Sequence, residues 1–200
     1  LKNEEKYTAY EIVELEKVIE SQYITRSLTN RTQILTTQAD ELIFQNDIAS
    51  KLSNLSLQLY EKLIKTGYAK SDEEFKEITK FFYERLPKID FERLGFREKL
   101  WYYKAYLWYS FLTQDFLSSY KFSLKWVEMF ENDSKMISIH PVFYLKGYNY
   151  LLESLTLINY PGKFKSTLDR MIKRTENSEF PDNDNLNTLI FLYKYNNWFN

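Results

Sequence analysis

The placement of glycine and proline constrains the fold of this chain more than any other feature of its sequence. Each occurs only four times in 200 residues, and both residues interrupt helices and strands. Seven of the eight fall between stretches of periodic apolar residues, at Gly67, Gly95, Gly162, Pro87, Pro141, Pro161 and Pro181. Only Gly147 lies inside such a stretch. The chain is therefore divided into segments of helix length.

Within these segments apolar residues recur at intervals of three and four, as in the series Leu52, Leu55, Leu59 and Leu63. No stretch shows sustained alternation with period two, so we predict an all-α protein. Nine helices are expected, at 4–22, 26–45, 47–66, 72–86, 96–114, 116–132, 141–158, 162–176 and 184–199. Ser71 is expected to cap the fourth helix, and Pro141 to open the seventh.

Short connections predict that successive helices pair as antiparallel hairpins. The turns expected at 66–68, 114–116 and 161–164 recur every 48 residues, because Gly67, Asp115 and Lys163 are evenly spaced. A repeat of this length in helical sequence indicates a solenoid of helix pairs.

The steps Asp115-Phe116 and Lys163-Phe164 resemble the turns of tetratricopeptide (TPR) hairpins. From Leu55 to Ile172 the chain is similar to the TPR-like proteins common in Bacteroidetes bacteria. Its period exceeds the 34 residues of that family, and no single unit carries the spaced tryptophan, glycine and alanine signature. The resemblance implies a right-handed α-α superhelix, a single solenoid domain over 1–200 that is a segment of a longer repeat protein. It implies a fold far more than an activity.

The helix at 96–114 holds seven aromatic rings in the eleven positions from Trp101 to Phe111. Such a helix is either buried on all sides or presents its rings to a ligand. We favour the core for most of them, and keep one stripe as a candidate binding surface on the concave face of the first helices. The candidate partner-binding residues are Asn54, Gln58, Trp101, Lys104, Trp108, Asn149 and Glu153.

Composition excludes several classes of function. The 27 basic and 28 acidic residues almost balance, so no overall field draws in nucleic acid or a charged membrane surface. With no cysteine and the single histidine His140, hydrolytic triads, thiolate chemistry and His-based zinc sites lack their residues. The lack of cysteine also fits a cytoplasmic location. We expect no catalytic residue, no cofactor and no metal, and interpret His140 as a helix-entry residue.

Two charged clusters have simpler explanations than binding. Asp72, Glu73, Glu74 and Glu77 crowd a helix start, where the helix dipole favours acids. The basic helix 162–176 could meet RNA or an acidic partner, but part of its charge lies at its C-terminal end, where positive charge is favoured anyway. No phosphate-binding loop is present, and no apolar run reaches the length of a membrane span.

The leading hypothesis is a non-enzymatic scaffold that binds an extended peptide or a partner helix on the concave face. The alternative is a regulatory sensor that binds a small signalling peptide and controls an effector outside this chain. An enzyme is the third option.

The sequence also makes specific predictions for the packing of both ends of the chain. Narrow apolar stripes on both N-terminal helices predict that one side of this first hairpin faces water and the other docks on the next hairpin. The stripes comprise Ile12, Leu15, Val18 and Ile19 on the first helix and Ile34, Leu35, Leu42 and Ile43 on the second. Residues 136–139 are expected to fold back against the array as a staple. Helix 184–199 carries more apolar surface than one hairpin covers, which predicts further hairpins or a homodimer through this end.

Overall fold

The computed structural model describes residues 5–27 and 30–176, and these residues form α-helices with no strand. The predicted all-α class is therefore confirmed for this part of the chain. The α-helices are α1 (Lys6–Tyr23), α2 (Arg31–Thr66), α3 (Asp72–Arg85), α4 (Phe96–Leu112), α5 (Phe116–Asn132), α6 (Ser134–Ile139), α7 (Pro141–Leu157) and α8 (Pro161–Glu176). Two 3₁₀ turns, η1 (Ile24–Arg26) and η2 (Phe91–Arg93), follow α1 and precede α4. The predicted helix 184–199, and with it the homodimer through that end, lies outside the described residues.

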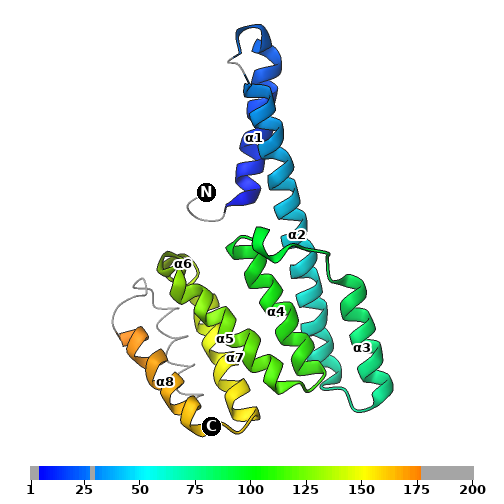
Figure 1. The fold of residues 1–200 in the computed structure, drawn as a ribbon, viewed down its shortest axis with the longest axis vertical. Helices are drawn as coiled ribbons and strands as arrows, with labels where there is room; N and C mark the ends of the chain where they lie inside the picture. Colours follow the sequence, from blue (N-terminus) through cyan, green and yellow to red (C-terminus); the bar gives the residue numbers. More distant parts are fainter. Residues whose placement is uncertain (1–4, 28–29, 177–200) are drawn as a thin grey trace.

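The molecule has a helical body from which one hairpin projects (Figure 1). The hairpin consists of α1 and the N-terminal half of α2. The C-terminal half of α2 enters the body, where it packs against α4 and, less extensively, α3. From there α4 packs on α5, α5 on α7 and α7 on α8. Ser71 caps α3 by accepting a hydrogen bond from the Glu74 N–H at 3.2 Å, and Pro141 is the first residue of α7, both as predicted.

The predicted helices 26–45 and 47–66 are wrong as separate elements, because α2 runs without a break from Arg31 to Thr66. Asn46 lies where the break was expected, but it is helical and buried. Its amide donates to the Lys6 carbonyl oxygen at 3.3 Å and accepts from the Arg97 guanidinium at 2.7 Å. Asn46 of α2 therefore joins α1 and α4 through its side chain.

The hairpin does not dock on its neighbour as expected. Ile12, Leu15, Val18 and Ile19 are all exposed, and Val13 is the residue of α1 that joins the small core with Leu35 and Ala39. The continuity of α2 explains the difference, since an unbroken helix carries its N-terminal half away from the body. The N-terminal end of α1 contacts the body, where Lys6 pairs with Glu98 of α4.

The hairpin turns repeat with a spacing that differs slightly from the predicted 48. Gln114 and Asn159 both adopt left-handed backbone conformations, with φ of 57° and 53°. Each turn also closes with the same bond five residues back, from the Asp115 N–H to Ser110 and from the Tyr160 N–H to Leu155. Gly67, with φ of 74°, follows α2 directly, and its N–H donates to the Leu63 carbonyl oxygen four residues back. Intervals of 47 and 45 residues therefore separate the three turns.

No residue of α4 is exposed. Of the seven rings from Trp101 to Phe111, those of Tyr103, Trp108 and Phe111 are buried in the core, and the other four are partly buried. The rings also fill the space beside the neighbouring helices. Tyr109, for example, stacks on Phe82 of α3 with centroids 4.3 Å apart. Residues 136–139 fold back against the body as predicted, with Met136 and Ile137 buried, and they do so as part of the short helix α6.

Gly147 is the one glycine inside a periodic stretch, and the packing explains it. An added Cβ would lie 3.0 Å from Cδ1 and 3.1 Å from Nε1 of the Trp126 indole, so α7 can approach α5 this closely only without a side chain. We expect Gly147→Ala to lower the free energy of unfolding by about 1–3 kcal/mol, as overpacked cores do.

Gly162 provides the matched control for this substitution. It lies in α8, and nothing would lie within 4 Å of an added Cβ. Gly162→Ala is therefore expected to leave stability unchanged or to raise it by up to about 1 kcal/mol. Urea unfolding of both variants decides the matter, and equal effects would contradict close packing at Gly147.

Candidate functional site

A groove of about 380 Å³ lies between α2, α4 and α7, with α5 beneath it. Its lining comes from all four helices and comprises Ser53, Asn54, Ser56, Leu57, Tyr60, Trp101, Lys104, Trp108, Trp126, Lys146 and Tyr150. A second hollow of about 280 Å³ adjoins it and shares Tyr60, Trp108 and Tyr150. The two together form one surface, which we call the central groove.

The structure brings most of the predicted site residues to the central groove. Asn54, Trp101, Lys104 and Trp108 line its larger part, and Glu153 lines the adjoining hollow. The two other candidates, Gln58 and Asn149, line neither part. Tyr60, Lys146 and Tyr150 complete the walls but were not among the candidates. Lys146 and Tyr150 are four residues apart on α7, a spacing that places both side chains on one helix face.

Aromatic contacts fix the shape of the central groove. The Trp108 ring lies between two tyrosines, with its centroid 4.7 Å from that of Tyr60 on α2 and 4.9 Å from that of Tyr150 on α7. Trp108 is itself 5% exposed, so it belongs to the core and to the groove wall at once. Three helices are thus tied together by rings at the point where a ligand would bind, which makes the wall rigid.

Lys104 provides the cationic part of the groove. Its Nζ lies 4.1 Å from the Trp101 ring centroid and 5.4 Å from that of Phe143, so the ammonium group sits among rings rather than carboxylates. Burial lowers the pKa of Lys104 to about 8, and the positive charge of Lys146 on α7 adds to the effect. In the described part of the chain no ion pair involves either lysine.

Glu153 provides an anionic group at the other end. It lies on α7, seven residues after Lys146, and borders the hollow formed by Tyr60, Trp108 and Tyr150. Burial among these groups raises the pKa of its carboxyl above the usual range. The residue remains exposed at its outer side. Within the described residues Glu153, like Lys104, has no counter-ion.

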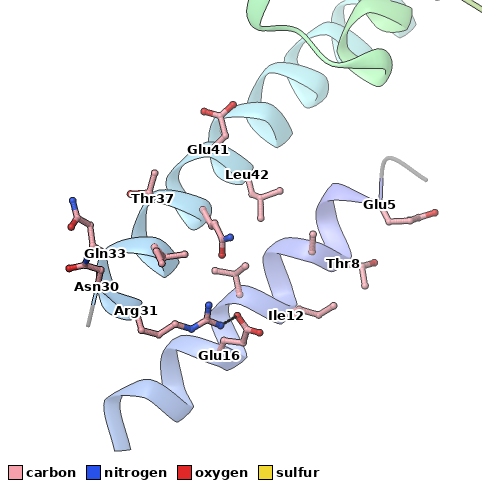
Figure 2. Close-up of a pocket in the computed structure, with 14 residues that line it drawn as sticks. Glu5, Thr8, Ile12, Glu16, Asn30, Arg31, Gln33, Thr37, Glu41 and Leu42 are labelled. Carbon is pink, nitrogen blue, oxygen red and sulfur yellow. Dashed lines mark hydrogen bonds and ion pairs between the residues drawn. The ribbon is translucent and has the colours of Figure 1, made fainter. Parts of the chain in front are cut away.

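A larger groove of about 1090 Å³ lies between α1 and α2 on the projecting hairpin. Figure 2 shows its lining side chains, with Ile12 of α1 and Leu42 of α2 on opposite sides. Three of its four charged side chains are already paired, since Arg31 contacts Glu16 at 2.9 Å and Glu41 contacts Arg93 at 3.0 Å. Among the described residues no aromatic ring lines this groove, in contrast to the central groove.

Other sequence candidates have structural roles. His140 precedes Pro141 at the start of α7, at the helix entry where it was expected. On the basic helix α8, Arg170 contacts Glu131 at 3.5 Å, while Lys163, Lys165 and Lys173 are exposed. In the ranges 5–27 and 30–176 no cluster of three metal-ligating side chains occurs. No helix of the same ranges has both the length and the apolar character needed to span a membrane.

Comparison with known proteins gave no match. No family model fits the chain, and no curated protein and no solved structure is significantly similar to it. The class of protein is therefore defined by what the structure itself contains, which is a helical body with an aromatic groove carrying opposite charges at its two ends.

Proposed function

We propose that this protein is a non-enzymatic interaction scaffold that binds an extended peptide or a partner helix in the central groove. In this proposal α2 with α3, α4 with α5 and α7 with α8 are successive units of a right-handed TPR-like solenoid, and α2, α4 and α7 line its concave face. The recurrence of one turn geometry at Gln114 and Asn159, after α4 and α7, supports the arrangement in repeats.

The observation that carries the proposal is the convergence of three helices on one aromatic groove. Interfaces for peptides are enriched in tryptophan and tyrosine, which bury a large area at small entropic cost. Here Trp101, Trp108, Tyr60 and Tyr150 come from three different helices and line one continuous surface. Polar groups at Asn54 and Lys104 can orient a bound backbone or side chain.

Leu57 allows a direct test, because it lines the central groove and is 66% exposed. We expect Leu57→Ser to weaken the binding of peptides selected from a random 12-residue library about tenfold. Losing the burial of one leucine side chain is worth at least this factor. Binding is measured by fluorescence anisotropy with labelled copies of the selected peptides.

Leu117 serves as the control, since it is 70% exposed on α5 and lines neither part of the groove. Leu117→Ser should change the affinity by less than twofold. Failure of the library to yield any peptide above background would contradict the scaffold. So would equal losses in the two variants, because the peptides would then bind elsewhere.

A further inference from the structure

We infer that the partner of the central groove is a peptide of opposite charge pattern, with an acidic side chain held by Lys104 and Lys146 and a basic side chain held by Glu153. An apolar side chain between them packs on Tyr60, Trp108 and Tyr150. This inference rests on the proposed function and adds to it the chemistry of the partner.

The two lysines at one end of the groove favour an anionic group on the ligand. Lys104 and Lys146 are both half-buried, come from different helices and line the same hollow. The groups that face Lys104 are Tyr60 of α2, Trp126 of α5, and Lys146 and Tyr150 of α7, so no carboxylate in this lining balances its charge. Two like charges in partial burial destabilise each other, and a ligand carboxylate would relieve both.

By the same reasoning, Glu153 at the other end favours a cationic group on the ligand. Glu153 borders a hollow of apolar and aromatic side chains, and only desolvation shifts its pKa. A lysine or arginine on the ligand would restore its charged form. The groove therefore presents two unbalanced charges of opposite sign, one at each end of an aromatic wall.

The distance between the two ends sets the spacing on the ligand. Lys146 and Glu153 are seven residues apart on α7, which corresponds to about 10 Å along a helix axis. Successive side chains of an extended strand point to opposite faces, so residues that enter the same groove are an even number of positions apart. The even spacing that best fits this distance is four positions, about 13 Å at roughly 3.3 Å each, with an aliphatic or aromatic residue midway on the same face.

The experiment is a selection from a random 12-residue phage library against the wild-type protein, Lys104→Met and Glu153→Gln. Lys163→Met is the matched control, because Lys163 is exposed on α8 outside the groove. Peptides selected by the wild type and by the control should be enriched in an acidic and a basic residue about four positions apart. Lys104→Met should lose the acidic preference, and Glu153→Gln the basic one.

Synthetic peptides then test the contact itself. Replacing the acidic residue of a selected peptide with glutamine should weaken its binding to the wild type at least tenfold, but its binding to Lys104→Met less than twofold. Selected peptides without this charge pattern, or glutamine peptides of unchanged affinity, would overturn the inference and leave the scaffold standing. An empty selection would overturn both.

The pH dependence of binding gives a second readout. The free Lys104 has a pKa of about 8, and a bound carboxylate raises it. Affinity for the acidic peptide should therefore be steady near pH 7 and fall by up to tenfold per pH unit above 8, while protonation of Glu153 lowers it at acidic pH. Lys104→Met should remove the fall above pH 8, and a fall there that persists in the variant would contradict the assignment to Lys104.

Discussion

Replacing Glu98 with alanine is expected to lower the free energy of unfolding by about 3–5 kcal/mol, because it breaks a buried ion pair. Glu98 at the start of α4 is 1% exposed, and Lys6 at the start of α1 is 5% exposed. Their charged atoms are 2.8 Å apart. The same carboxylate accepts the Gly95 N–H at 3.0 Å and contacts Arg97 at 3.4 Å.

These contacts make Glu98 the attachment point of the projecting hairpin. The Arg97 guanidinium also lies 4.7 Å from the centroid of the Tyr7 ring of α1. The other neighbours of α1 are α2 and η1, so the ion pair and this contact link α1 to α4. Loss of the carboxylate leaves buried positive charge at this junction. We therefore expect Glu98→Ala to raise protease susceptibility in α1 as well as to lower global stability.

Asp47→Ala is the control for this prediction. Asp47 pairs with Lys51 at 2.6 Å on the exposed side of α2, where an ion pair contributes less than about 1 kcal/mol. The variant with both Lys6→Met and Glu98→Leu should recover most of the stability, since apolar residues often replace a buried pair without loss. Urea unfolding compares the four proteins, and a loss below 1 kcal/mol for Glu98→Ala would contradict a buried link.

The helices could be predicted because their signals are local. Spacings of three and four, a capping serine at Ser71 and a proline at position 141 act within one or two turns. The break expected near residue 46 failed for a related reason. The Asn46 side chain donates to the Lys6 carbonyl oxygen and accepts from Arg97, and both residues are far away in the sequence. Only the fold shows that a polar residue there stabilises a continuous helix.

The candidate site was predictable in part for the same physical reason. Trp101, Lys104 and Trp108 share one face of a single helix, so their spacing reveals them. Which residues of α2 and α7 face them depends on how the helices are rotated and shifted against each other, and this is set by packing. Gln58 and Asn149 were chosen from correct helices but lie away from the groove, whereas Tyr60 and Tyr150 make the contacts with Trp108.

Trp126→Ala is the second change with a large expected effect, about 3–5 kcal/mol of lost stability. The Trp126 side chain is fully buried on α5, at the bottom of the central groove. It packs against the backbone of α7 at Gly147, and its ring lies 5.8 Å from that of Tyr150. Truncation leaves a cavity between α5 and α7 that the rigid aromatic wall cannot fill.

Trp126→Phe separates the volume of this side chain from its polar atom. The buried indole Nε1 has no hydrogen-bond partner among the described residues, so phenylalanine removes an unsatisfied donor and breaks no bond. We therefore expect Trp126→Phe to cost less than half as much as Trp126→Ala in urea unfolding. Equal losses would show that the indole N–H makes a stabilising contact. A loss below 1 kcal/mol for Trp126→Ala would mean that α5 and α7 do not close around this ring.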